Sequence, residues 1–273
     1  MSELTVRADI DLLRFDLFAG IRHGISTRHG GTSDPPYDSL NLGYSTPDTE
    51  DCVAENRSRF ATALGISRDT LVTAHLTHGS DVAVFDADSP DSWPMQWRRV
   101  RPGSQRFTWV FDADAVIGTA PSLTFLLTAA DCTPILFWDP VRAVVGAAHA
   151  GWRGTARGIA GNVVRAMTRS FGTEASDVIA GIGPSMGPCC YTVGNDVVDT
   201  FGAFGMDPAL IEDHDRIRLD LWESNRRQLL SAGVPDGSIE IMGLCTGCHV
   251  SDFFSHRAES GRTGRMAGAI GRG

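Results

Sequence analysis

Lysine is absent from this chain of 273 residues, so all 24 of its basic side chains are arginine. This absence excludes a lysine Schiff base, a pyridoxal-phosphate lysine and a lysine-bearing P-loop. A bound anion must therefore be held by arginine, by backbone N–H groups or by a metal ion. Acidic residues number 33, and the net charge of −9 disfavours nonspecific binding to nucleic acid or to an anionic membrane.

Long apolar runs are also missing. Stretches such as 123–130 and 143–148 are far too short to cross a bilayer, and the first residues lack the basic and apolar regions of a signal peptide. We therefore expect a cytoplasmic protein whose six cysteines are thiols or metal ligands rather than a disulfide framework. A hydrophobic fraction of 42% indicates a globular chain with a substantial core.

The pattern of apolar residues predicts an α+β fold in one domain over residues 1–273. Glycine-rich and polar stretches predict a long loop at 21–48 and an inserted loop at 88–109. Thr155 is the predicted N-cap of the second helix, and the strands at 135–138 and 143–148 are expected to form a hairpin. The expected helices are 49–65, 155–172 and 219–233, and the expected strands are 82–85, 123–128, 135–138, 143–148, 178–180 and 238–242.

Polar residues that suit chemistry lie at the ends of apolar strands. Cys132 follows Asp131 directly after one such strand, and His149 ends another before a glycine-rich turn. A cysteine with an acid and a remote histidine suits either a nucleophile with its base or a metal site. His75 and His78 have a spacing that could bind metal, although such pairs at a helix-to-loop boundary commonly bind none. The spacing alone leaves these alternatives open.

The remaining cysteines include a CxxCH segment, Cys245 to His249, with the spacing of a c-type haem attachment. We reject that function because haem attachment needs export. A zinc ribbon would need a second CxxC, which the chain lacks, and a redox CxxC would need a helix N-terminus at its first cysteine. Cys189 and Cys190 are interpreted as two packed thiols in a turn.

Several arginines lie in glycine-rich or polar loops. Each is individually an ordinary solvated side chain, but in a chain without lysine they are together candidate anion ligands. They are Arg28, Arg153, Arg257, Arg262 and Arg265.

Nine motifs between about residue 26 and residue 270 closely resemble those of a known family, the bacterial YfiH family, to which the human protein FAMIN is related. Its members were long labelled laccase-like multicopper polyphenol oxidases and are now better understood as zinc-dependent purine nucleoside phosphorylases that also deaminate adenosine. The resemblance implies a fold with β-sheets sandwiched between helices in four layers, shared with certain toxin cysteine deamidases. The motifs are STRHGGTS, YDSLNLG, THGSDV, DADAVIG, LTAADCTPILFWDP, AAHAGWRGT, GIGPSMGPCCYTVG, DLWESNRRQLL and CTGCHVSDFFSHRAESGRTGRMAGAI.

The resemblance also implies a metal ion, zinc by default, held by His78, Cys132 and His149. Three protein ligands with an open fourth position are typical of catalytic zinc, and the same donors suit copper. Three features depart from the family pattern. Leu76-Thr77 replace the usual Gln-Val, the loop at 88–109 looks longer, and Cys248 is not a fixed family position.

The implied partners are a purine nucleoside and phosphate, with adenosine, inosine, guanosine and methylthioadenosine all open as substrates. Deamination needs a water activated near neutral pH, which zinc supplies, and Asp131 is the candidate proton shuttle. Arg28 with the backbone N–H groups of Gly30 and Gly31 is the first candidate for phosphate, and Asn41 is a candidate substrate contact. Arg153 and Arg257 are further candidates for binding an anion.

Three rival functions remain. A metal-free cysteine hydrolase would use Cys132 as nucleophile and His149 as base, but it would not need His78. Copper-dependent polyphenol oxidation is the older family label, and the HxH pairs of copper oxidases are absent from this chain. A non-enzymatic zinc-stabilised module is disfavoured because structural zinc sites are closed by four protein ligands.

Overall fold

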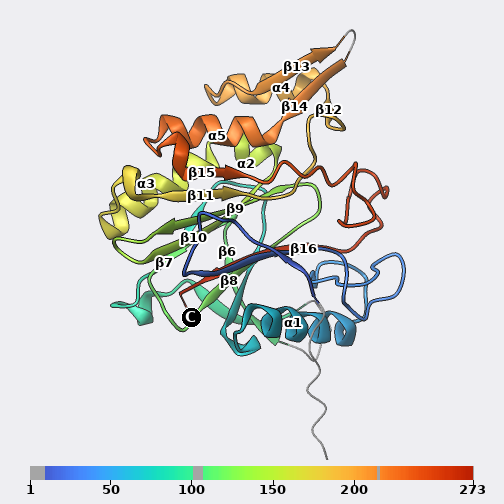
Figure 1. Cartoon of the computed structure of the whole chain (residues 1–273), viewed down its shortest axis with the longest axis vertical. Coiled ribbons are helices and arrows are strands. Elements are labelled where there is room, and N and C mark those ends of the chain that lie inside the picture. The colour runs from blue at the N-terminus through green and yellow to red at the C-terminus, as the bar shows by residue number, and fades with distance from the viewer. Residues whose placement is uncertain (1–9, 101–106, 214–215, 273) are drawn as a thin grey trace, which may run out of the picture.

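Two large β-sheets pack against each other at the centre of this computed structural model, which describes residues 10–100, 107–213 and 216–272 (Figure 1). In the described residues the first sheet has seven strands, in the spatial order β1 (Leu12–Leu13), β2 (Arg22–Ser26), β16 (Met266–Gly271), β8 (Thr124–Ala129), β3 (Leu71–His75), β6 (Phe107–Asp112) and β5 (Met95–Arg99). The second has six, in the order β15 (Ile239–Ile241), β11 (Ile179–Ile182), β9 (Thr133–Asp139), β10 (Val144–Ala150), β7 (Ala115–Gly118) and β4 (Val82–Phe85).

Helices cover the outer faces of both sheets. The first sheet is covered by α1, through Phe60 and Leu64, and the second by α3 and α5, through residues such as Val163 and Leu229. The α+β class is therefore confirmed, and helices lie on the outer face of each large sheet; that residues 1–273 form one domain stays a prediction. The helices are α1 (Glu50–Leu64), α2 (Trp152–Ala156), α3 (Ile159–Phe171), α4 (Asn195–Ala203) and α5 (Leu221–Ser231), with short 3₁₀ turns η1 (Arg68–Thr70), η2 (Pro90–Ser92), η3 (Ala175–Asp177) and η4 (Asp236–Ser238).

The core between the two sheets is rich in phenylalanine. Phe85, Phe111 and Phe125 are fully or almost fully buried there, and their ring centroids lie 5.0 to 6.4 Å apart. Aromatic rings in tilted or edge-to-face contact bury large apolar areas and pack with defined geometry. This packing fixes the two sheets relative to each other, and so fixes the loops that leave their ends.

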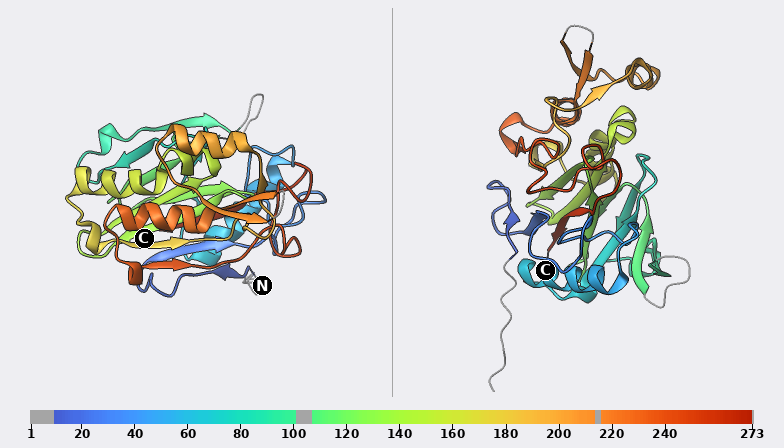
Figure 2. Two further views of the ribbon diagram at one scale, coloured as in Figure 1. Left: turned by 90° about the horizontal axis from the view of Figure 1, so that it is seen from above. Right: turned by 90° about the vertical axis from the view of Figure 1, so that its right-hand side faces the viewer.

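A third sheet and α4 project beyond the two central sheets (Figure 2). This sheet has the order β12 (Thr192–Val193), β14 (Arg216–Asp220) and β13 (Ala209–Asp213). Phe201 of α4 and Leu219 of β14 are buried in a small cluster of their own. The sequence reading missed this sheet and α4 because their strands are short and rich in charged residues. None of the helices in the described part of the chain has the length and apolar character of a membrane span.

Several local predictions are confirmed. The helix predicted at 49–65 is α1: the hydroxyl of Thr49 accepts a hydrogen bond from the backbone N–H of Cys52 at 3.4 Å, and Gly65 ends the helix with φ 72°. The hairpin predicted around 139–142 is formed by β9 and β10, which pair antiparallel. Strand β4 matches the prediction at 82–85, and β8, β11 and β15 lie within one or two residues of theirs.

The inserted loop predicted at 88–109 is wrong in its main part. Strands β5 and β6 pair antiparallel there, at the edge of the seven-stranded sheet, while 101–106 lie outside the described residues. Met95 and Trp109 pack against the core between the sheets. An edge strand is half solvated, so its arginines hid the alternating pattern that identifies a strand.

Two helix starts also differ from prediction. Thr155 is buried inside α2, which begins after Gly151, and α3 begins after Gly158 with φ 75°. The Thr155 hydroxyl pairs with the Asn225 side chain instead of capping a helix. The last helix begins at Leu221, because the Asp220 carboxylate accepts from the N–H of Glu223 at 3.0 Å. The loop predicted at 21–48 is correct except for β2.

Candidate active site

Three of the predicted site residues meet where the two central sheets adjoin. His78 follows β3, Cys132 lies between β8 and β9, and His149 lies near the end of β10. One donor atom from each side chain lies within 4.8 Å of the others. The imidazole rings of His78 and His149 stand edge to face, with centroids 5.0 Å apart. The structure therefore brings together the three side chains for which the family resemblance implies a metal.

The His78–Cys132–His149 cluster lines a pocket of about 590 Å³, a size that suits a small organic ligand. Its wall carries two aromatic side chains, Trp152 and Tyr191. Three arginines, Arg153, Arg257 and Arg265, line the same pocket. One cavity thus combines metal-ligating donors, aromatic surface and positive charge in an otherwise acidic protein.

Asp114 is the buried residue that orients both histidines. Its carboxylate accepts from the backbone N–H groups of His78 and Gly79 at 2.9 and 2.6 Å and from the Thr77 hydroxyl at 2.7 Å. It also lies 3.2 Å from Nδ1 of His149. Because Asp114 engages Nδ1, the His149 nitrogen left for a ligand is Nε2. Such carboxylate–histidine pairs fix the ring and tautomer of metal-bound histidines.

The electrostatics of the cluster differ between its two histidines, favouring positive charge on His149 and disfavouring it on His78. Burial disfavours the charged form of Asp114, but hydrogen bonds from His149 and Thr77 outweigh it and hold the pKa of that carboxyl well below its usual range. Burial also disfavours charge on His149, yet Cys132 and Asp114 favour it and raise the pKa of His149 to about 9. Burial and the adjacent His149 lower the pKa of His78. The cluster thus stabilises a positive charge beside Asp114.

Cys132 fits against the turn that follows His149. A Cβ at Gly151 would approach the Cys132 sulfur to 2.7 Å, so only glycine leaves room for the thiol at this place. The preceding residue, Asp131, has φ 83°, an uncommon conformation for a residue with a side chain. The HAGWRG motif therefore supplies both His149 and the space that Cys132 needs.

Asp131 lines the pocket, but its carboxylate already has several hydrogen-bond partners. It accepts from the hydroxyls of Thr246 and Ser255 at 2.6 and 2.8 Å and from the backbone N–H of Arg257 at 2.7 Å. These three hydrogen bonds hold the Asp131 carboxylate in place next to Cys132, and its role as a proton shuttle stays a prediction.

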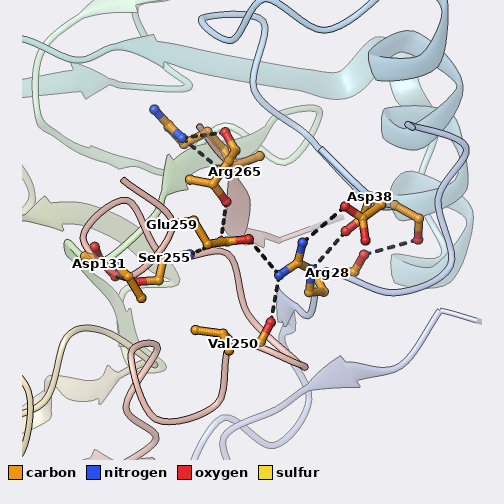
Figure 3. Close-up of polar contacts among 11 residues, drawn as sticks. Arg28, Asp38, Asp131, Val250, Ser255, Glu259 and Arg265 are labelled. Atoms are coloured by element: carbon orange, nitrogen blue, oxygen red, sulfur yellow. Dashed lines mark hydrogen bonds and ion pairs between the residues drawn. The ribbon is translucent and has the colours of Figure 1, made fainter. Parts of the chain in front are cut away.

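Arg28, the first predicted phosphate ligand, lies outside the pocket of the His78–Cys132–His149 cluster. It is 9% exposed, and its guanidinium donates to the Asp38 and Val250 carbonyls and pairs with Glu259 at 3.1 Å (Figure 3). It lines a separate hollow of about 280 Å³. Its donors are occupied by the protein itself, so it ties the 28–39 loop to the 250–259 segment.

The other predicted binding residues of the N-terminal loop also make contacts within the protein. The N–H of Gly31 donates to the Ser39 hydroxyl at 3.1 Å, and a Cβ there would collide with the Ser39 carbonyl. Gly30, with φ 89°, forms the turn beside it. Asn41 is fully buried, and its side chain bonds Thr46, Asp48 and the backbone. These residues pack the loop closely, and their contacts to a ligand stay a prediction.

The pocket arginines differ from Arg28 in exposure. Arg153 and Arg257 are exposed, and their guanidinium groups lie over the rings of Trp152 and Tyr191, at 4.3 and 5.4 Å from the centroids. Within the described residues, neither side chain forms an ion pair with an acid. Arg265 is half-buried and donates to the carbonyls of Thr263 and Gly264. His75 also lines the pocket, but its ring bonds Asp112 at 2.9 Å instead of joining the cluster.

Sequence reasoning did not single out Asp114, Trp152 or Tyr191. One signal for Asp114 was available, since an acid directly before the apolar segment Ala115–Gly118 needs a partner when it is buried. Trp152 and Tyr191 lie in the quoted motifs, but nothing in their spacing indicates that their rings face a common cavity.

Comparison with known proteins shows the family to which this chain belongs. The family model described as "Multi-copper polyphenol oxidoreductase laccase" matches residues 22–273. This chain belongs to that family. It is 38% identical over 259 residues to a protein of Geobacillus stearothermophilus named purine nucleoside phosphorylase YlmD, covering 93% of this chain and 91% of the relative. It is 34% identical over 255 residues to purine nucleoside phosphorylase YfiH of Escherichia coli, covering 92% and 93%.

Solved structures of the family have the same fold. The crystal structure of YlmD from Geobacillus stearothermophilus matches with a TM-score of 0.84 and 38% identity over 96% of both chains. That of a Bacillus licheniformis hypothetical protein, YfiH, matches with a TM-score of 0.82 and 39% identity over 92% of both. The YfiH resemblance seen in the motifs is therefore confirmed.

Proposed function

We propose that this protein is a metal-dependent purine nucleoside phosphorylase that also deaminates adenosine. One observation carries the proposal: His78, Cys132 and His149 converge in a pocket that three arginines also line. The names of the relatives from Geobacillus stearothermophilus and Escherichia coli support the nucleoside as substrate.

The donor set fits a catalytic metal ion. His78, Cys132 and His149 offer two imidazoles and a thiolate, and their cluster opens to the pocket. Such donors suit zinc, and the same set also binds copper. An ion bound here would supply Lewis-acid chemistry. Asp114 would hold His149 in the tautomer that leaves Nε2 for the ion.

The pocket residues have roles that suit phosphorolysis. In this reaction a phosphate oxygen bonds to C1′ of the ribose while the bond from C1′ to the purine nitrogen breaks, and the base leaves with a proton. Arg153, Arg257 and Arg265 would hold the phosphate, whose charge this lysine-free chain must meet with guanidinium groups. Trp152 and Tyr191 would pack against the flat base.

The test of this function is the phosphate dependence of inosine cleavage. We expect ribose 1-phosphate and hypoxanthine when phosphate is present, and negligible cleavage without it. Equal cleavage without phosphate would mean a hydrolase and would overturn the proposal. Release of ammonia from adenosine in phosphate-free buffer tests the deaminase activity separately.

The metal-free cysteine hydrolase is distinguished by His78. If Cys132 were a nucleophile with His149 as base, His78→Ala would leave most of the activity. We expect His78→Ala to remove the metal ion of the His78–Cys132–His149 cluster and nucleoside turnover together, because the third donor is part of that site.

A further inference from the structure

Four cysteines form a second cluster outside the candidate active site. Cys189 and Cys190 lie in the turn after β11, and Cys245 and Cys248 lie in the segment after β15. All four sulfur atoms lie within 4.8 Å of one another. The Cys248 sulfur is 3.3 Å from that of Cys189 and 3.4 Å from that of Cys190. The expectation of two packed thiols at 189–190 is therefore incomplete, because the CxxC segment joins them.

The backbone holds the two cysteine-bearing segments side by side. Ser185 and Cys245 form a parallel β-bridge. In it the backbone N–H of Ser185 donates to the Leu244 carbonyl, and the backbone N–H of Thr246 donates to the Ser185 carbonyl. The N–H of Gly187 donates to the Cys245 sulfur at 3.3 Å. A Cβ at Gly247 would approach Cys190 and Met186 to 3.2 and 2.9 Å. The thiols are thus gathered by a fixed framework rather than by chance contact of mobile side chains.

We propose that Cys189, Cys190, Cys245 and Cys248 bind one zinc ion as a closed structural site. Zinc binds thiolate at about 2.3 Å in a tetrahedron, which sets sulfur atoms roughly 3.8 Å apart. The observed separations, from 3.3 Å up to the 4.8 Å limit, bracket this value. An iron–sulfur cluster is several atoms wide and would hold its cysteines farther apart. The site therefore fits a single ion.

Disulfide bonding fits this arrangement less well. A disulfide joins two sulfurs at about 2.05 Å and leaves the others out. Here Cys248 lies almost equally close to Cys189 and Cys190, and all four thiols share one small volume. Four sulfur atoms within 4.8 Å of one another suit a single bound ion.

The zinc site would brace one wall of the active-site pocket. Met186 and Tyr191, on either side of the Cys189–Cys190 pair, line the pocket. The backbone N–H of Met186 donates to the Asp131 carbonyl at 2.9 Å, and Thr246, beside Cys245, donates to the Asp131 carboxylate. Removal of the ion should therefore raise the nucleoside KM more than it lowers kcat, because the wall moves while the reacting groups remain.

Metal content of the full-length chain tests the proposal, measured by elemental analysis and native mass spectrometry in reducing buffer without chelator. We expect about two zinc ions per chain in the wild type, one in Cys248→Ser and in Cys189→Ser, and one in Cys132→Ala. Cys52→Ser is the matched control, because Cys52 lies on α1 outside both clusters, and it should keep two.

The Cys132→Ala chain keeps the test decisive even if the other variants fail to fold. Loaded with Co²⁺, it should show the intense thiolate charge-transfer absorption of a tetrahedral four-thiolate site. A Cys132→Ala chain that folds but holds no metal would overturn the proposal. So would a Cys248→Ser chain with the wild-type metal content, or a disulfide among the four cysteines of the wild type. All of these readouts are independent of nucleoside turnover, so they stand apart from the proposed function.

Discussion

The pocket around Cys132 and the network around Arg28 are both built from arginine- and glycine-rich motifs. Their arginines differ in burial and in how many of their donors bond to the protein itself. Arg28 is buried, and its donors are taken by Asp38, Val250 and Glu259. Arg153 and Arg257 are exposed at a cavity. The difference shows that motif chemistry alone does not assign a role: an arginine can bind a ligand only where its own fold leaves donors unused.

The two regions are nevertheless connected. Glu259, the partner of Arg28, also accepts from the backbone N–H of Ser255 at 2.9 Å, and the Ser255 hydroxyl donates to Asp131 beside Cys132 (Figure 3). Arg28 thus supports the pocket at a distance. Two kinds of variant can therefore be compared: those that remove a reacting or binding group from the pocket, and those that weaken the hydrogen bonds holding such groups in place.

The largest effect is expected at the cluster itself. Cys132→Ala and His149→Ala should each lower kcat for nucleoside turnover by roughly a thousandfold or more, because loss of a ligand removes several kcal/mol of Lewis-acid stabilisation. Circular dichroism and thermal melting should show that the fold remains. If folded Cys132→Ala kept most of its activity, both the metal site and the cysteine-nucleophile alternative would be wrong.

Asp114→Asn should have an intermediate effect. The amide keeps the size of the side chain but loses the charge that holds His149 and the His78 turn. We expect a loss of about 10- to 100-fold in metal affinity or activity, as for other partners of metal-bound histidines. Asp112→Asn is the matched control, since Asp112 is 44% exposed and pairs with His75 and Arg98 outside the cluster. Equal metal affinity in the two variants would show that Asp114 does not support the metal site.

The smallest effects on turnover are expected from two arginine variants, which should differ in whether they change the phosphate KM or the stability of the protein. Arg153→Ala should raise the phosphate KM about tenfold with little change in stability, because it removes one charge-assisted contact. Arg28→Ala should leave the phosphate KM unchanged and lower the free energy of unfolding by about 2 kcal/mol, since it removes a charge-assisted hydrogen bond to the partly buried Glu259. Steady-state kinetics and urea unfolding measure both. The reverse pattern would restore Arg28 as the phosphate ligand.

Local signals were readable from the sequence. Thr49 and Gly65 bracket α1, and the turn at 139–142 joins two apolar strands, because capping and turn chemistry act over a few residues. The cluster of His78, Cys132 and His149 was identified through family motifs, since three separate strand ends supply it.

The missed features depend on contacts between distant segments. Asp114 meets the His78 turn from 36 residues away, and Arg28 meets Glu259 across 231. Cys189 and Cys248, 59 residues apart, looked unrelated because the Cys189–Cys190 segment is not the second CxxC that a zinc ribbon needs. Burial and pairing at such separations are set by the packing of the two sheets, which residue spacing does not encode.

The most direct test of the central claim is removal and return of the metal. The account predicts that the chain stripped by a chelator loses phosphate-dependent inosine cleavage. Two equivalents of zinc, enough to fill both the four-cysteine site and the His78–Cys132–His149 cluster, should restore it in the wild type but not in His78→Ala. Copper added to the same stripped protein shows whether the ion's identity matters. Full activity of the stripped, metal-free chain would contradict the account.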